Sequence, residues 1–348
     1  MKTYHAIGLM SGTSLDGLDI CYVRFDYDST CSFEILKAQT IPYSSDWKSN
    51  LKDAIHFSAM DLMKLHSDYG FYLGSQVLEF INTNHISDVD VIASHGHTIF
   101  HQPHLKFTTQ IGDGRAIKEV TKLPVIYDFR TQDVLKGGNG APLVPIGDQL
   151  LFSDYDACLN FGGFSNISFQ NSGERIAFDI CPVNIVLNHF ANQLGKDFDE
   201  DGKLAEKGVI QPKILSQLND LAFYSQNPPK SLGLEWVQEN CFPLLLGLKS
   251  EDALATFTEH CAIQIAKIIN QFQLKKILCT GGGAYNRFLI QSIEKKTNTS
   301  LEIGSPILTD YKEALIFALM GVLKLRNEVN VLSTATGSSE DHSTGVIA

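Results

Sequence analysis

The sequence predicts an α/β protein of two similar halves with a cleft between them. Two segments, residues 4–25 and 157–170, each have the pattern strand, small-residue turn, strand. They lie about 150 residues apart, nearly half the chain, as in a duplicated unit. The 348 residues are sufficient for two domains with separate cores. We therefore expect an N-terminal lobe over residues 1–150 and a C-terminal lobe over 151–348.

The first turn, residues 8–19, reads Gly-Leu-Met-Ser-Gly-Thr-Ser-Leu-Asp-Gly-Leu-Asp. Small residues let backbone N–H groups approach phosphate oxygens closely, and the hydroxyls add donors. An ordinary hairpin with a wide turn fits the composition equally well. A nucleotide-binding turn would use Gly12, Thr13, Ser14, Leu15, Asp16, Gly17, Leu18 and Asp19. Of these, Asp16 and Asp19 are suited to hold the waters of a Mg²⁺ ion.

Two further glycine turns favour the nucleotide interpretation. The second contains Gly162 and Gly163, with Asn166 shortly after. The third contains Gly281, Gly282 and Gly283, follows the apolar run 277–279 and opens a helical pattern over 284–296. Three glycine turns at strand ends are difficult to explain as unrelated loops, so we expect one phosphate hairpin in each half.

The remaining elements of the first half follow from hydrophobic periodicity. Apolar residues that recur every three or four positions predict a helix over residues 47–80. Residues 89–93 and 123–127 have the pattern of short buried strands that end in polar residues. The polar, Gly-rich stretch 131–140 is predicted to connect the halves.

The second half continues with a third strand at residues 175–180 and then with helices. The clearest helical pattern covers residues 251–272, with Ser250 as the predicted N-cap. Thr309 is predicted to cap a last helix that ends at Leu325.

The overall charge argues against two classes of partner. With a formal net charge of −11, the chain is poorly suited to bind nucleic acid or an anionic membrane surface. The seven scattered cysteines form no Cys-x-x-Cys pair, which is typical of a reducing compartment. There is no run of about 18 apolar residues and no signal-peptide core, so we expect a soluble, cytoplasmic protein.

Taken in order, these motifs resemble those of the anhydro-N-acetylmuramic acid kinases, members of the sugar kinase/Hsp70/actin superfamily. The matching segments are residues 8–19, 94–96, 112–114, 128–130, 137–145, 160–163, 199–202, 228–231, 255–256, 281–286 and Glu313. The resemblance implies a duplicated ribonuclease-H-like (actin-like ATPase) fold of two lobes with a central cleft.

The resemblance also implies the chemistry. The family uses ATP and Mg²⁺ to open the 1,6-anhydro bridge of anhydro-N-acetylmuramic acid and to phosphorylate O6. The product is N-acetylmuramate 6-phosphate, in the recycling of peptidoglycan. Residues 281–283 would then lie close to the adenosine of ATP. The binding partner would be a small-molecule sugar, and the sequence leaves undecided whether the protein forms a homodimer.

Asp179 is the predicted catalytic base, because it ends a strand-like run before Pro182 and would face the crevice of an α/β sheet. A helix N-cap or a loop-tying Asp is the alternative. The family places its catalytic Asp at this motif, where it would deprotonate the water that attacks the anomeric carbon. The chain departs from the family pattern Asp-Thr-Gly-Pro-Gly-Asn at Cys181 and Val183. Since Val disfavours positive φ, the loop requires an ordinary backbone conformation.

A run of four histidines occupies residues 94–104. Histidines two residues apart share one face of a strand and would suit zinc, but no carboxylate or thiol lies at a fitting interval, so we expect no tightly bound transition metal. The family commonly has Gln where this chain has His97, which would donate a hydrogen bond to a sugar oxygen.

Arg130 and Glu313 complete the residues predicted to bind the sugar. The guanidinium of Arg130 suits the lactyl carboxylate of a muramic acid, and a salt bridge to Asp128 or Asp133 is the alternative. Glu313 is a pocket residue by resemblance, while its place in a first helical turn suits the helix dipole.

Two other functions remain open at the level of sequence. Residues 281–286 nearly match the fingerprint Gly-x-Gly-x-x-Gly, and Glu302 follows about 20 residues on, as in an NAD-dependent oxidoreductase. That interpretation leaves both Gly/Ser hairpins unexplained. The residues at 181 and 183 would also suit a non-catalytic relative that opens and closes on a nucleotide without transferring phosphate.

Overall fold

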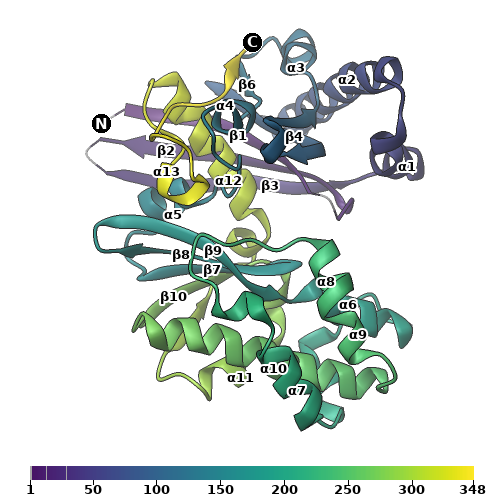
Figure 1. Ribbon diagram of the computed structural model, residues 1–348. Helices are drawn as coiled ribbons and strands as arrows, with labels where there is room; N and C mark the ends of the chain where they lie inside the picture. The colour runs from purple at the N-terminus through teal and green to yellow at the C-terminus, as the bar shows by residue number, and fades with distance from the viewer. Residues whose placement is uncertain (1, 13, 29) are drawn as a thin grey trace. The chain divides into compact units, whose positions relative to one another are not determined.

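The computed structural model describes residues 2–12, 14–28 and 30–348. They form two compact units: unit 1 extends from the N-terminus to Leu151 and includes Tyr311–Ala348, and unit 2 is Phe152–Asp310. Each unit contains one β-sheet with its own helices (Figure 1). The chain therefore returns to unit 1 at Tyr311, which differs from the single C-terminal lobe over 151–348 that was expected from the sequence.

Among the described residues of unit 1, seven strands form a sheet of order β12-β6-β4-β1-β2-β3, with β5 paired to β4. The strands are β1 (Lys2–Ser11), β2 (Gly17–Tyr27), β3 (Cys31–Pro42), β4 (Val91–Gln102), β5 (Phe107–Ile111), β6 (Val125–Tyr127) and β12 (Val346–Ile347). The helices are α1 (Ser45–Asp53), α2 (Ala59–Thr83), α3 (Gly114–Thr121), α4 (Thr131–Leu135), α5 (Pro145–Leu151), α13 (Ser333–Thr336) and most of α12 (Pro306–Leu325).

Unit 2 has a five-stranded sheet of order β11-β10-β7-β8-β9 in the part of the chain that the structure describes. Its strands are β7 (Ala157–Phe161), β8 (Phe164–Asn171), β9 (Glu174–Pro182), β10 (Lys276–Thr280) and β11 (Ser300–Ile303). Its helices are α6 (Asn184–Gln193), α7 (Pro212–Asn219), α8 (Leu234–Asn240), α9 (Phe242–Leu245), α10 (Ser250–Gln271) and α11 (Arg287–Glu294).

The two sheets share one topology. Each begins with three consecutive antiparallel strands, β1-β2-β3 in unit 1 and β7-β8-β9 in unit 2. Each sheet then adds two parallel strands on the other side of its first strand. In unit 1, β4 pairs with β1 and β6 pairs with β4; in unit 2, β10 pairs with β7 and β11 pairs with β10. Helices supply the crossovers that parallel strands need. This repeated arrangement confirms the predicted duplicated ribonuclease-H-like fold.

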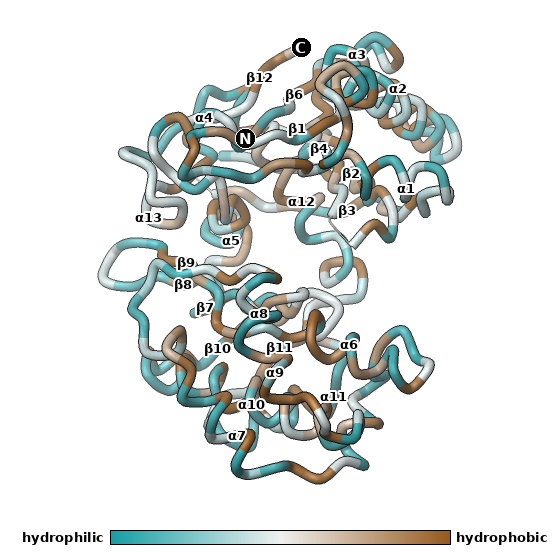
Figure 2. The backbone as a smooth tube through the Cα atoms, turned by 45° about the vertical axis from the view of Figure 1, so that its right-hand side comes forward, coloured by the Kyte–Doolittle hydropathy of each residue, from teal (hydrophilic) through white to brown (hydrophobic). Residues whose placement is uncertain are grey.

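Each unit has a core made by helices packed on its sheet. In unit 1, Tyr69 and Leu73 of α2 are buried with Ile7 and Ile20 of the sheet. In unit 2, α10 contributes fully buried side chains such as Phe257. Hydrophilic and hydrophobic residues alternate along α10 (Figure 2), as expected for a helix with one face toward the core.

Close backbone packing explains why α12 returns the chain to unit 1. A Cβ on Gly8 of β1 would lie 1.8 Å from the carbonyl oxygen of Ala314, and a Cβ on Gly321 would lie 2.8 Å from Cβ of Ala93. Only glycine permits backbones to approach so closely. Residues 311–348 therefore pack with the first half of the chain and complete the sheet of unit 1 through β12.

Several elements differ from the sequence-based prediction in the first half. The predicted helix over 47–80 is interrupted at residues 54–58, between α1 and α2. The predicted strand 89–93 continues as β4 to Gln102, so most of the histidine run is strand. The stretch 131–140 does not connect the units, because it contains α4 and lies within unit 1.

The predicted helix caps also differ. Lys249 is the N-cap of α10, and Ser250 Oγ donates to Gln193 Oε1 at 2.9 Å. Thr309 lies inside α12, whose first turn is held by Ser305 through its carbonyl oxygen, and Glu313 lies in the helix interior and not in the predicted first turn. Pro306 at the first helical position provides the reason, since a proline fits there without losing a hydrogen bond.

Candidate functional site

A row of four polar side chains crosses the sheet of unit 2. Thr280 of β10, Asn160 of β7, Asn166 of β8 and Asp179 of β9 lie directly opposite one another in successive strand pairs. Residues opposed in this way direct their side chains to the same face of the sheet. The register thus brings Asn166, a predicted phosphate contact, beside Asp179, the predicted base.

Asp179 lies within β9, which continues to Pro182, and not at the strand end that the sequence indicates. Its N–H donates to the carbonyl oxygen of Lys230 at 3.0 Å, and the N–H of Leu232 donates to its Oδ2 at 2.8 Å. Burial raises the pKa of Asp179 to about 6, and the Leu232 N–H opposes this rise. A carboxylate with a pKa near neutrality is suited to act as a general base.

The two departures from the family pattern lie next to Asp179 but have packing roles. Cys181 is fully buried in the core, with its thiol 3.3 Å from Ser165 Oγ. Val183 avoids positive φ, as expected, but with φ −132° and ψ −93° it lies outside both the β and the right-handed α region, so the expectation of an ordinary backbone conformation is wrong. Its N–H donates to the carbonyl oxygen of Gly163 at 2.8 Å, so the loop is tied to the second glycine turn.

The second and third glycine turns meet at one edge of this sheet. A Cβ on Gly281, where φ is +83°, would lie 2.6 Å from Asn160 Oδ1. A Cβ on Gly283 would lie 2.9 Å from Cβ of Phe161. A Cβ on Gly282, in contrast, would meet no described atom within 4 Å. Packing between the turns therefore requires the two outer glycines, and Gly282 leaves room for a ligand.

A pocket of about 460 Å³ lies beside this junction in unit 2. Its lining includes the amide side chains of Asn184, Asn188 and Asn286, and the exposed rings of Phe198 and Tyr285. The volume is in the range of small-molecule sites, and aromatic rings with a few amides are typical of their walls. Asp199, Glu200 and Asp201 also line the pocket, and so do Gly282 and Gly283 of the third glycine turn.

Sequence reasoning assigned a binding role to Gly282 and Gly283 of this lining, but it assigned none to Phe198, Tyr285 or the amide side chains. Tyr285 lies within the matching segment 281–286, and Phe198 directly precedes the matching segment 199–202, so the resemblance marks the neighbourhood of both rings. Asn286 caps α11 by accepting from the Leu289 N–H. It therefore has a helix-capping role where a dinucleotide fingerprint requires its third glycine.

The first glycine turn, in unit 1, is open. The Leu15 N–H donates to the Gly12 carbonyl oxygen at 3.3 Å, and Ser14 and Asp16 are exposed. Among the described atoms, a Cβ on Gly12 would meet only Ser14 Oγ, at 3.6 Å. The predicted contact at Thr13 lies outside the described residues.

The later residues of that motif belong to β2. A Cβ on Gly17 would lie 2.5 Å from the carbonyl oxygen of Ile41, and Leu18 is 1% exposed in the core. Asp19 Oδ1 accepts from Thr40 Oγ at 2.6 Å. The side chain of Leu18 thus packs inward, and a nucleotide contact by Gly17 or Leu18 would have to use the backbone.

His97 belongs to a buried chain of polar groups. Its Nδ1 lies 2.9 Å from Ser11 Oγ, which accepts from the Tyr43 hydroxyl at 2.7 Å, and that hydroxyl lies 2.6 Å from the hydroxyl of Tyr69. Burial lowers the pKa of His97 to about 4, so the ring is neutral at physiological pH.

Arg130 has no salt bridge to Asp128 or Asp133, the alternative that the sequence left open. The described residues give it a hydrogen bond from Nε to His95 Nε2 at 2.8 Å and one from Nη1 to the Gly140 carbonyl oxygen, and no ion pair. Burial lowers the pKa of Arg130 to about 10, and Glu313 opposes this. A half-buried guanidinium without an ion pair among the described residues is suited to bind an anionic ligand.

The four histidines do not converge. His95 contacts Arg130, His97 contacts Ser11, and His101 contacts Thr108. Within the described ranges, no three His, Cys, Asp or Glu residues are placed to hold a metal ion. The same part of the chain contains no helix with the length and apolar character of a membrane span.

The duplicated topology and the glycine turns define a protein of the actin-like ATPase fold. The family model described as anhydro-N-acetylmuramic acid kinase matches residues 4–348. The anhydro-N-acetylmuramic acid kinase of Francisella tularensis subsp. novicida is 33% identical, with 96% of each chain covered, and that of Zymomonas mobilis is 33% identical, covering 95% of this chain and 96% of the relative. The chain therefore belongs to the anhydro-N-acetylmuramic acid kinase family.

Solved structures include a similar chain, the (R)-2-hydroxyglutaryl-CoA dehydratase component A of Acidaminococcus fermentans. It is 14% identical, with a TM-score of 0.49, and the match covers 93% of this chain and 99% of that one. The family match leaves the oxidoreductase and the non-catalytic alternatives without support.

Proposed function

We propose that the protein is an ATP-dependent kinase that opens the 1,6-anhydro bridge of anhydro-N-acetylmuramic acid with water and phosphorylates O6. The products are N-acetylmuramate 6-phosphate and ADP. The family match over residues 4–348 supports this reaction. The observation on this chain that carries the proposal is Asp179, held by the Leu232 N–H and with its pKa raised to about 6.

Asp179 acts as the base that starts the reaction. It takes a proton from a water molecule while the water oxygen forms a bond to the anomeric carbon C1. The bond from C1 to O6 breaks, and its electron pair stays on O6, which becomes the nucleophile. ATP supplies the phosphoryl group that O6 receives, with ADP as the leaving group. The proton from water remains on Asp179 until solvent removes it.

The adenosine is held by the pocket of unit 2. The exposed rings of Phe198 and Tyr285 stack on the base, and Asn184 and Asn188 donate hydrogen bonds from their amides. The open flank of Gly282 leaves space for the first phosphates. Asn160, whose side chain lies against Gly281, is a further candidate phosphate contact.

In unit 1, the turn at Gly12 to Asp16 supplies backbone N–H groups and the Ser14 hydroxyl to phosphate oxygens. Mg²⁺ would be held through the carboxylates of Asp16, exposed at this turn, and Asp19. Carboxylates and water are the ligands this ion prefers. Because ATP is the phosphoryl donor, we propose the cytoplasm as the compartment.

The sugar carries a lactyl carboxylate, and Arg130 is the residue that binds it. Its guanidinium is held by His95 and Gly140 and has no ion pair among the described residues. Glu313 contributes a carboxylate near Arg130, and neutral His97 offers its ring to a sugar hydroxyl.

One isotope experiment tests both halves of the reaction. The purified protein is incubated with ATP, Mg²⁺ and anhydro-N-acetylmuramic acid in ¹⁸O-labelled water, and the product is examined by mass spectrometry. We expect one labelled oxygen at C1 and none in the phosphoryl group, with ADP released in equal amount. Label in inorganic phosphate without opened sugar would contradict the proposal. The Asp179→Asn variant is the control for background hydrolysis.

A further inference from the structure

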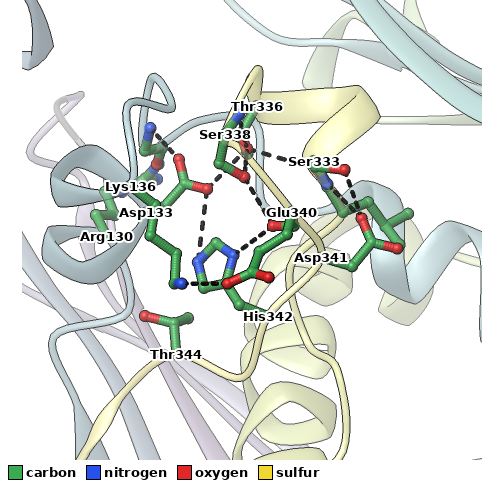
Figure 3. Close-up of polar contacts among 12 residues, drawn as sticks. Arg130, Asp133, Lys136, Ser333, Thr336, Ser338, Glu340, Asp341, His342 and Thr344 are labelled. Atoms are coloured by element: carbon green, nitrogen blue, oxygen red, sulfur yellow. Dashed lines mark hydrogen bonds and ion pairs between the residues drawn. The ribbon is translucent and has the colours of Figure 1, made fainter.

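Asp133 of α4 is a fully buried carboxylate, 0% exposed, and each of its two oxygens accepts a hydrogen bond. Its Oδ2 accepts from the Gly140 N–H at 2.6 Å, and its Oδ1 accepts from Thr336 Oγ at 2.7 Å. His342 Nε2 lies 3.6 Å from the same Oδ1 (Figure 3). Burying a carboxylate is unfavourable unless its oxygens accept hydrogen bonds, and an apolar side chain would fill the same space without that cost. The presence of Asp133 here therefore points to a role other than packing.

Gly140 joins Asp133 to Arg130. Its N–H donates to Asp133 while its carbonyl oxygen accepts from Arg130 Nη1. With φ +68°, Gly140 adopts a conformation that favours glycine, and a Cβ there would lie 2.8 Å from Cγ2 of Val134. One peptide segment therefore transmits the position of the buried carboxylate to the guanidinium.

Residues 330–348, which we call the C-terminal brace, hold this segment from a distant part of the sequence. The Asn139 N–H donates to the Thr336 carbonyl oxygen at 2.8 Å, and the Ser339 N–H donates to that of Lys136 at 3.2 Å. Thr344 Oγ donates to the Phe129 carbonyl oxygen at 3.0 Å. The brace thus contacts the chain on both sides of Arg130, and Thr336 also binds Asp133 directly.

We propose that Asp133 is a positioning residue for substrate recognition, and that Thr336 of the brace fixes its orientation. By holding Gly140, Asp133 aims the Arg130 guanidinium at the carboxylate of the sugar. This inference rests on the proposed function, since it requires Arg130 to bind that carboxylate. The residue does not touch the reacting atoms, so it acts on the affinity for the acidic sugar and not on phosphoryl transfer.

The test removes one hydroxyl and leaves the shape of the side chain. Thr336→Val loses the donor to Asp133, and Thr336→Ser keeps it. Glu340→Gln is the matched control, because Glu340 belongs to the same brace but its carboxylate makes only a surface contact, with Lys136 outside the brace. Steady-state kinetics are measured for anhydro-N-acetylmuramic acid and for ATP, with thermal unfolding in parallel. We expect Thr336→Val to raise KM for the sugar roughly tenfold, the effect of losing one hydrogen bond to a charged group. KM for ATP and kcat should stay within about twofold, and Thr336→Ser and Glu340→Gln should resemble the parent.

A second substrate separates the possible failures. 1,6-Anhydro-N-acetylglucosamine lacks the lactyl group, so its binding by the parent and by Thr336→Val should be equal. Equal KM values for the acidic sugar in both proteins would overturn the positioning role while leaving the kinase intact. Losses of similar size for both sugars and ATP, together with a lowered Tm, would also overturn it, because they indicate a role in folding only. If the parent does not act on the acidic sugar at all, the proposed function itself fails, and this inference fails with it.

Discussion

The Oδ2 atom of Asp179 accepts a hydrogen bond of 2.8 Å from the backbone N–H of Leu232, which lies more than fifty positions further along the chain. The N–H of Asp179 donates in turn to the carbonyl oxygen of Lys230 at 3.0 Å. Residues 230–232 thus bind the proposed base through backbone groups alone. The base is oriented without a second charge, and its pKa is set mainly by burial.

Replacing Asp179 by Asn should abolish turnover without disturbing the fold. The amide has nearly the same shape, and its oxygen still accepts from Leu232, but it cannot take a proton. A positioned base contributes ~10²–10⁴-fold, and we expect kcat to fall by at least the upper figure because both bond changes depend on it. ADP and sugar product are measured separately and should fall together. Full ATP hydrolysis with closed sugar would show that Asp179 is not the shared base.

The decline of kcat/KM at low pH should reflect the protonation of the Asp179 carboxylate. Its carboxyl must be ionised to act as a base, so kcat/KM is expected to decline about tenfold per pH unit below about pH 6. An ordinary Asp would place this decline near pH 4. His97 has a pKa of about 4 and stays neutral above it, so it adds no step between pH 5 and 8. The measurement is a kcat/KM series from pH 4.5 to 9 at constant ionic strength. A flat profile down to pH 4.5 would contradict the role of burial.

Gly12→Val should impair nucleotide binding and leave folding intact. A Cβ at Gly12 has room within the described structure, but the added methyl groups would occupy the space that the proposed phosphate contact needs. Gly281→Val is the contrasting variant, because its φ of +83° and the 2.6 Å approach to Asn160 Oδ1 should destabilise the protein by about 2 kcal/mol or more. Calorimetric titration with Mg-ATP and thermal melts distinguish the two effects. Unchanged ATP binding by Gly12→Val would show that the first turn is purely structural.

The two exposed rings of the unit 2 pocket should carry part of the affinity for ATP. Phe198→Ala and Tyr285→Ala each remove a stacking surface without disturbing the core, since both side chains are exposed. We expect KM for ATP to rise several-fold to tenfold in each variant, because a stacked aromatic contact contributes about 0.5–1.5 kcal/mol. KM for the sugar is the internal control. If KM for ATP is unchanged in both variants, the adenine ring does not stack on Phe198 or Tyr285.

No tightly bound transition metal is expected, despite the four histidines. Their side chains contact different groups, Arg130, Ser11 and Thr108 among them. Elemental analysis after gentle purification should find far less than one zinc per chain, and dialysis against a chelator followed by return of Mg²⁺ should restore full activity. A stoichiometric zinc would refute this and would favour a metal-dependent hydrolase.

The sequence by itself was sufficient for everything that depends on neighbouring residues. The hairpins β1–β2 and β7–β8 were predicted because each pair of strands is joined by one short turn, so that local composition decides the pairing. The order of the motifs along the chain was sufficient to predict the family and the duplicated fold. The negative φ of Val183 was also predictable, since a β-branched side chain restricts its own backbone, but its ψ of −93° was not.

Only the tertiary structure decided which distant residues meet. The row from Thr280 to Asp179 depends on the register of three strand pairs, and one shifted residue would turn these side chains to the opposite face. The sequence offered two carboxylates, Asp128 and Asp133, as ion-pair partners of Arg130. In the folded chain Asp133 accepts hydrogen bonds from Gly140 and Thr336 instead, and the guanidinium has no ion pair among the described residues. The return of residues 311–348 to unit 1 depends on the close approach of α12 to Gly8. These residues are about 300 positions apart in the sequence, and hydrophobic periodicity describes only local segments, so it cannot predict this contact.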